Sequence, residues 1–207
     1  MSLTRDGGKT FANVTPKDMP DFGRVSIIDA SAFDAGSAYV AVKRPLLADM
    51  APYIFRTHDF GKTWTKIVTG IRADDYVHAV REDPYRKGLL YAATQHGVYI
   101  SYDDGDHWES LSLNLPDVPV SDLTVVANDL AISTHGRGFY ILSDITPIRN
   151  YTPAAMTADA YLFPPPVAIR SAGGARIEYW LKKAPQSLTL DILDAKGAVI
   201  RTYTGAG

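Results

Sequence analysis

Thr57-His58-Asp59-Phe60-Gly61-Lys62-Thr63-Trp64 is one of three copies of an eight-residue pattern in this 207-residue chain. The other two copies span residues 4–11 and 101–108. Each copy places Asp, Gly and an aromatic residue at fixed offsets after a hydroxyl residue: Asp6, Gly8 and Phe11; Asp59, Gly61 and Trp64; and Asp103, Gly105 and Trp108. A pattern that recurs in this way indicates an architecture of repeated structural units.

The residue types of the pattern are those of a tight hairpin turn. An Asp carboxylate accepts hydrogen bonds from nearby backbone N–H groups. Gly adopts the positive φ that such turns need. The aromatic residue begins the next strand and buries a flat surface against the neighbouring hairpin. Three equivalent turns cannot form one active site, so we interpret these aspartates as structural.

The spacing of the copies gives the size of the repeated unit. Asp59 and Asp103 are 44 residues apart, which is close to one four-stranded unit. Short apolar runs bounded by Gly, Pro or Asp predict the strands. We expect strands at 25–30, 38–43, 53–57 and 64–69; at 76–81, 89–94, 98–102 and 108–113; and, in a unit without the pattern, at 122–126, 130–134 and 138–142.

Composition excludes several classes of site. The chain has no cysteine, which excludes disulfides and thiolate metal sites. Its five histidines show no metal-ligand spacing, so we expect no metal and no cofactor. A net charge of -2 gives no indication of a nucleic-acid partner. No apolar run approaches the length of a membrane span.

The sequence changes character after residue 149. Residues 150–174 are rich in Pro, Ala and Gly, and the run Pro164–Pro166 favours an extended connector, so this stretch is interpreted as a linker. Residues 175–207 hold three more expected strands, at 176–181, 188–193 and 199–203. Those strands resemble the start of an immunoglobulin- or fibronectin-like β-sandwich that the chain does not complete.

The eight-residue pattern resembles the Asp-box, or BNR repeat, of sialidases, xyloglucanases and sortilin-type proteins. Residues 81–92 and 129–142 also resemble the C-terminal part of large bacterial proteins named BNR-repeat or sortilin-like glycosyl hydrolases. The resemblance implies an all-β fold over residues 1–149, a partial β-propeller of about three to four blades with Asp-box hairpins. It also implies that the boxes lie away from the active-site face, and that the full-length protein is secreted or periplasmic.

Propeller ligands sit on loops that lead into the innermost strand or join strands two and three. Those loops carry our ligand-binding candidates, which are Arg72, His96, His135 and Arg137, and the catalytic candidates Asp74 and Asp75. Glycoside hydrolysis uses two carboxyl groups about 5–10 Å apart. Adjacent strand residues point to opposite faces, which argues against Asp74 and Asp75 acting together.

Two functions remain open from the sequence. One is a fragment of a glycoside hydrolase-like propeller that binds or cleaves polysaccharide and is inactive by itself. The other is a non-catalytic, sortilin-like scaffold that binds peptides or proteins through an apolar or cationic channel. An arc of blades leaves faces and strand edges exposed, so we also expect contact with the missing blades or with another copy of the chain.

Overall fold

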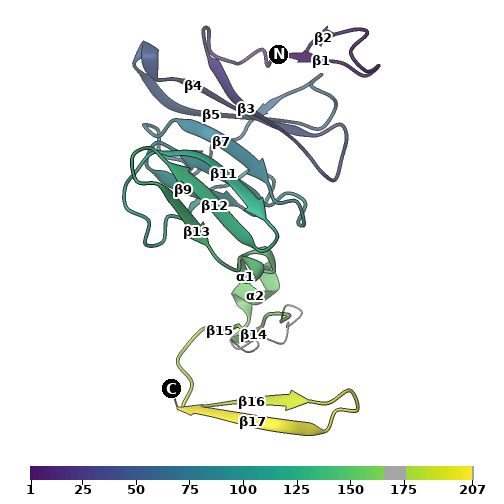
Figure 1. Cartoon of the computed structure of the whole chain (residues 1–207), viewed down its shortest axis with the longest axis vertical. Coiled ribbons are helices and arrows are strands. Elements are labelled where there is room, and N and C mark those ends of the chain that lie inside the picture. The colour runs from purple at the N-terminus through teal and green to yellow at the C-terminus, as the bar shows by residue number, and fades with distance from the viewer. Residues whose placement is uncertain (166–175, 207) are drawn as a thin grey trace. The chain divides into compact units, whose positions relative to one another are not determined.

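The computed structural model of the protein describes residues 1–165 and 176–206 (Figure 1). The chain divides into two compact units, residues 1–145 and 146–207. The first unit contains all three copies of the Asp-box, and the second contains the expected linker and the C-terminal strands.

The first unit is built from antiparallel sheets that follow one another along the chain. Two have four strands, in the orders β3-β4-β5-β6 and β7-β8-β9-β10; a third has the order β11-β12-β13, and a hairpin of β1 and β2 precedes them. The strands are β1 (Ser2–Leu3), β2 (Ala12–Asn13), β3 (Arg24–Ala30), β4 (Ala38–Arg44), β5 (Asp49–Thr57), β6 (Thr65–Lys66), β7 (Val77–Glu82), β8 (Leu90–Thr94), β9 (Gly97–Ser101), β10 (Glu109–Ser110), β11 (Val120–Val126), β12 (Asp129–Thr134) and β13 (Phe139–Leu142), with a short 3-10 helix at Pro45–Leu47.

We call the three sheets the first, second and third blades. The innermost strands of the blades are β3, β7 and β11, and β7 lies beside the other two. Arg81 on β7 pairs with Asp29 on β3 at 3.2 Å and with Asp122 on β11 at 3.3 Å. The backbone N–H of Glu82 also donates to Asp29 (2.9 Å). Sheets that meet through their innermost strands form a partial β-propeller, which confirms the predicted fold class (Figure 1).

The core of this unit lies between the first and second blades. Its fully buried members come from both sheets, and Trp108 of the third Asp-box is only 3% exposed. The other buried members include Tyr39, Ala41, Ile54, Ile67, Val77, Val80, Leu90 and Ala92. Alternate residues of each strand therefore enter the interface between blades, as the two-residue period of a strand requires.

Each Asp-box forms the hairpin turn that the sequence predicts. In the second copy, Thr57 Oγ1 accepts from the N–H of Gly61 (3.0 Å) and donates to Asp59 Oδ1 (2.9 Å). The Asp59 carboxylate also accepts from the N–H and hydroxyl of Thr63, at 2.9 and 2.6 Å. The first copy repeats these bonds around Asp6, and the third repeats them around Asp103 except that the His107 ring nitrogen replaces the Thr hydroxyl, at 2.7 Å from Asp103 Oδ2.

The box also joins each blade to the one before it. The indole N–H of Trp64 donates to Val14 O (2.8 Å), and that of Trp108 donates to Ile67 O (3.0 Å). Val14 and Ile67 each lie ten residues after the start of the preceding box. The aspartates thus shape the turns while the tryptophans link successive blades.

The second unit differs from the sequence-based expectation. It contains α1 (Thr146–Arg149), α2 (Pro153–Thr157), and strands β14 (Ala160–Leu162), β15 (Tyr179–Leu181), β16 (Ser187–Leu193) and β17 (Val199–Ala206). None of the helices among the described residues is long and apolar enough to cross a membrane.

The strand β14 lies inside the expected linker and pairs with β15, because the apolar run at 160–163 offers a partner for Tyr179–Leu181. The helix α2 also lies inside the expected linker, and residues 166–174 of that linker lie outside the described residues. Strands β16 and β17 form a separate hairpin, so the described strands make two two-stranded sheets. The structure therefore does not confirm the start of a β-sandwich.

Candidate functional site

The predicted site residues lie in three loops at one end of the second and third blades. We call this end the loop face; it comprises the loop before β7, the β8–β9 turn and the β12–β13 turn. The antiparallel pairing of Val77 with Thr94 and of Val120 with Thr134 brings the start of each innermost strand to the end of the second strand.

Arg72 and Asp74 form an exposed ion pair with each other. The Arg72 Nε and Nη2 atoms donate to Asp74 Oδ1 and Oδ2, at 3.1 and 2.9 Å. This forked hydrogen bond lowers the pKa of Asp74 below its ordinary value. Asp74 is therefore ionised at neutral pH and already hydrogen-bonded to Arg72. A carboxylate in this state is unsuitable as a general acid, which must carry a proton.

Asp75 is fully buried and holds the loop face together. Its carboxylate accepts from Thr94 Oγ1 (3.1 Å) and from the backbone N–H of His96 (3.0 Å). These bonds tie the loop before β7 to the β8–β9 turn. Asp74 is exposed and Asp75 is buried, although both lie in the loop before β7, so the two carboxylates do not face one site. The burial and hydrogen bonds of Asp75 give it a structural role.

His96 pairs with a carboxylate that the sequence did not single out. Its Nδ1 lies 2.8 Å from Asp117 Oδ1, and Asp117 is largely exposed. The contact links the β8–β9 turn to the loop before β11. The exposed carboxylates Asp74 and Asp117 are thus each paired with a basic side chain, Arg72 and His96 respectively.

A second group of residues on the loop face was not predicted. Lys43, at the end of β4, donates from Nζ to His78 Nδ1 (2.9 Å), and His78 Nε2 lies 3.4 Å from Gln95 Oε1. An ammonium group can only donate, so Nδ1 must accept and the ring proton must sit on Nε2, facing the amide oxygen. We call Lys43, His78 and Gln95 the loop-face relay.

The loop-face relay is electropositive. Burial, followed by the charge of Lys43, lowers the pKa of His78 below 6.5, and His135 adds to this effect; the hydrogen bond to Gln95 and the charge of Asp75 oppose it in part. Burial and the nearby Arg24 lower the pKa of Lys43. Within residues 1–165 and 176–206, neither Lys43 nor Arg24 has a carboxylate in ion-pair contact.

His135 and Arg137 are exposed in the β12–β13 turn. Gly136 and Gly138 adopt positive φ values there, and the N–H of His135 donates to Pro119 O (2.8 Å). Arg72, by contrast, is already paired with Asp74. The sequence signal that could have indicated the loop-face relay is His78 itself, a polar residue between the apolar residues Val77 and Ala79 of β7.

The opposite end of the blades carries a Ser–His–Asp series. His58 Nδ1 lies 2.6 Å from Ser37 Oγ, and His58 Nε2 lies 2.9 Å from Asp104 Oδ2. However, the Ser37 hydroxyl donates to Asp34 Oδ2 (2.6 Å), which lowers the pKa of Asp34, and Ser37 is only 3% exposed. His58 must then donate to Ser37, so the series joins blades and does not activate a nucleophile.

No group of three or more potential metal-ligating side chains occurs in the described part of the chain. No protein-family model matches the chain, and neither does any curated protein. Among solved structures, YCF48 bound to a D1 peptide is similar, with a TM-score of 0.51 and 17% identity, over 69% of this chain and 44% of that chain.

Two glycoside hydrolase structures are also similar. A GH74 enzyme from Niastella koreensis has a TM-score of 0.45 and 15% identity, over 58% of this chain and 21% of that chain. The GH74 xyloglucanase from Xanthomonas campestris has a TM-score of 0.43 and 14% identity, over 68% of this chain and 25% of that chain. The chain spans less than half the length of each of these structures, and at such identity the likeness shows the fold alone.

Proposed function

We propose that the chain is part of a β-propeller that binds an acidic peptide or protein segment at its loop face and performs no hydrolysis there. The observation that carries this proposal is the loop-face relay. Lys43 is partly buried, lies near Arg24 and His78, and has no carboxylate in contact among the described residues. A charge in that position gains most from a ligand that brings a carboxylate.

The pKa directions agree with an anion-binding role. The pKa values of Lys43 and His78 are both lowered by burial and by neighbouring positive charge. A bound carboxylate would offset the second cause, because it would place a negative charge beside Lys43, which has no carboxylate in ion-pair contact among the described residues. Gln95 and the exposed His135 can add further hydrogen-bond donors around the same ligand.

The hydrolase alternative is less well supported by these residues. Of its two candidates, Asp75 is buried and bonded internally, and Asp74 is bonded by Arg72. A neutral polysaccharide would also gain little from the charge of Lys43. YCF48, a protein of the same fold, is described as bound to a peptide, and a peptide ligand suits the loop face of this chain as well.

A matched pair of peptides tests the proposal. We expect a fluorescein-labelled Glu-rich peptide to bind the chain more tightly than the same peptide with Gln in place of Glu, and the binding to weaken with salt. Lys43→Gln should weaken binding by roughly fivefold or more, since it removes one charged hydrogen-bond donor. Lys87→Gln, an exposed change in the loop between β7 and β8 at the other end, should have no effect.

Fluorescence anisotropy provides the binding curves, and reducing-sugar release from xyloglucan is measured with the same preparations. Equal affinity for the two peptides, or an unchanged affinity of Lys43→Gln, would contradict the binding proposal. Release of sugar by the wild-type chain would favour the hydrolase alternative.

A further inference from the structure

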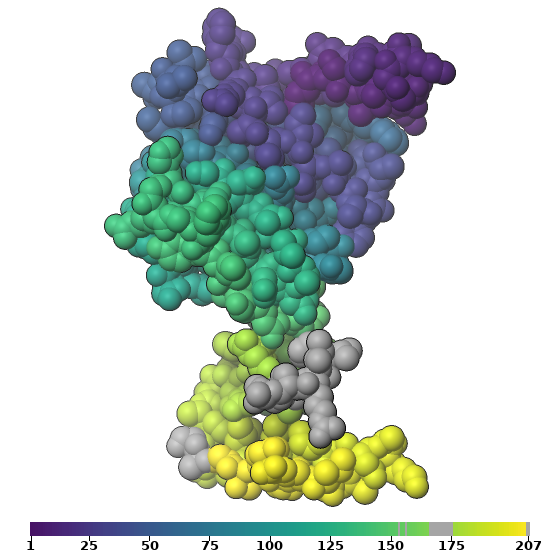
Figure 2. All heavy atoms as spheres, in the orientation of Figure 1, coloured from purple at the N-terminus to yellow at the C-terminus, as the bar shows by residue number. Residues whose placement is uncertain are grey.

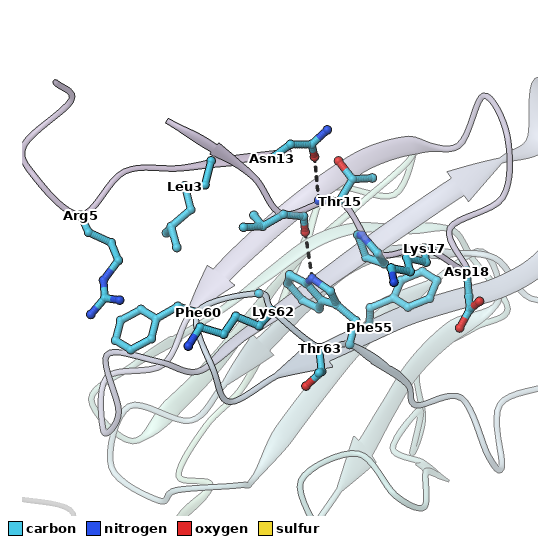
Figure 3. A pocket seen from close by; sticks show the side chains of 15 residues that line it. Leu3, Arg5, Asn13, Thr15, Lys17, Asp18, Phe55, Phe60, Lys62 and Thr63 are labelled. Atoms are coloured by element: carbon cyan, nitrogen blue, oxygen red, sulfur yellow. Dashed lines mark hydrogen bonds between the residues drawn. The ribbon is translucent and has the colours of Figure 1, made fainter. Parts of the chain in front are cut away.

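A pocket of about 620 Å³ lies between the β1–β2 hairpin and the second Asp-box (Figure 3). None of the residues that line it belongs to the loop-face relay. Its volume falls in the range of about 300–1,000 Å³ that is typical of small-molecule sites. The pocket is therefore a separate feature of the first blade.

The sequence explains why the pocket exists at this interface between blades. Two equivalent turns follow the boxes, closed by hydrogen bonds from Met19 N–H to Pro16 O (3.2 Å) and from Ile71 N–H to Val68 O (3.1 Å). The second turn carries Gly70, whose added Cβ would lie 2.1 Å from the backbone oxygen of Trp108. Only Gly allows that close contact, and Trp108 is accordingly buried.

The first turn carries charged residues where the second carries Thr69 and Gly70. Lys17 and Asp18 line the pocket together with Trp64, whereas Gly70 in the second turn approaches the backbone of Trp108 closely. Trp64 is consequently less buried than Trp108 and also lines the pocket. The same repeat thus gives a closed contact in one place and a cavity in the other.

The pocket has an apolar wall and a positively charged end. The half-buried Trp64 forms the wall, with the buried Phe55 behind it, and the indole N–H of Trp64 is already donated to Val14 O, so the ring offers an apolar surface. Figure 3 shows Arg5 and Lys62 near Phe60 at one end, and Lys17 and Asp18 at the other. The charge of Lys17 thus has a carboxylate nearby.

Arg5 is held in place at the charged end. Its guanidinium carbon lies 4.1 Å from the centroid of the Phe60 ring. A guanidinium stacked on a ring still presents its N–H groups at its edge, where a carboxylate can accept two of them. In the described residues neither Arg5 nor Lys62 forms an ion pair.

We propose that this pocket binds a small amphipathic organic anion. Its carboxylate pairs with Arg5 and Lys62, and its flat apolar body lies against Trp64. The two cations give the site its preference for an anion, and the aromatic wall gives it a preference for a ring-bearing ligand over a simple inorganic anion. This proposal is independent of peptide binding at the loop face.

The probe for this site is 2-naphthoate, and its uncharged comparator is 2-naphthamide. We expect calorimetric titration to show binding of the carboxylate and binding of the amide that is weaker by roughly fivefold or more. Lys62→Gln and Arg5→Gln should each reduce the affinity for 2-naphthoate by a similar factor. Both side chains are exposed, so the variants should fold, which circular dichroism checks.

Lys9→Gln is the matched control, because Lys9 occupies the same position in the first box as Lys62 does in the second but does not line the pocket. Lys43→Gln should also leave 2-naphthoate binding unchanged, which separates this site from the loop face. The absence of binding at millimolar 2-naphthoate, equal binding of the amide, or an affinity loss in Lys9→Gln equal to that in Lys62→Gln would each overturn the proposal.

Discussion

Backbone conformation explains which residues the Asp-box can accept at its centre. The fourth residue of each box has a positive φ, at 72° in Gly7 and 63° in both Phe60 and Asp104. The fifth is always Gly, with φ between 77° and 92°. Two successive left-handed residues make the tight turn, and in the second and third boxes the Gly at the second of them also packs against Val14 or Ile67 of the preceding unit.

Alanine substitutions of two box glycines distinguish the cost of backbone strain from the cost of overpacking. A Cβ on Gly105 would lie 2.4 Å from Ile67 Cδ1, whereas one on Gly8 would meet nothing closer than 4.0 Å. Both have nearly the same φ, so backbone strain is matched. Gly105→Ala should therefore cost about 1–2 kcal/mol more than Gly8→Ala because of overpacking. Thermal unfolding that gave the two variants the same melting temperature would refute this assignment.

The imidazole of His78 should make stability depend on pH. Its pKa is lowered below 6.5 in the folded chain, so the unfolded chain binds more protons as the pH falls through 6.5. Folding is then destabilised on the acid side of neutrality, and the loss stops below the folded-state pKa. His78→Gln removes this group, so its unfolding free energy in urea should decline less between about pH 7 and pH 5 than that of the wild type. Parallel curves would show that His78 does not titrate in this way.

At the scale of elements, successive boxes contact each other at equivalent positions, but the interaction is cation–π in one pair of boxes and a hydrogen bond in the next. The second residue of one box meets the fourth residue of the next: Arg5 stacks on Phe60, and His58 pairs with Asp104 at 2.9 Å. Asp104 also accepts from the hydroxyl of Tyr39, and Arg56 donates to its backbone oxygen at 2.6 Å. The variable positions of the repeat are thus the positions that connect one blade to the next.

Two neighbouring carboxylates of the third box should differ in their effect on stability. Asp104 is bonded by three residues of the first blade, one of them the buried Tyr39. The side chain of Asp106 is 58% exposed and pairs with Arg56 at 3.1 Å. Asp104→Asn should cost about 2 kcal/mol, because it weakens a charged hydrogen bond to a buried donor, and Asp106→Asn less than about 0.5 kcal/mol. Chemical denaturation measures both, and a larger loss for Asp106→Asn would contradict the assignment.

The elements that the sequence predicted are those with local signals. The box turns and most blade strands follow from residue type and spacing, although β6 and β10 are only two residues long where six were expected. The loop-face relay was not predicted, because Lys43 and His78 are 35 positions apart and meet only when two blades pack. The strand β14 was not predicted, because it is only three residues long and Pro164–Pro166, which follow it closely, favour an extended connector.

At the scale of the molecule, the first unit is an arc of blades with an exposed edge. The strand β13 ends the third blade, and Phe139 and Ile141 on it are 83% and 63% exposed. Contact of this edge with further blades or with another copy of the chain stays a prediction. The function proposed for the arc depends on its loop face, which residues of all three blades form together.

The five histidines of the chain allow a direct test of that function. Imidazole signals in NMR spectra are followed at pH 7 while the Glu-rich peptide is added. The proposal predicts that the signals of His78 and His135 shift, that His78 begins as the neutral Nε2–H tautomer, and that His58 and His107, at the other end of the blades, stay unchanged. Shifts confined to His58 and His107, or no shift at His78 while the peptide binds, would contradict ligand binding at the loop face.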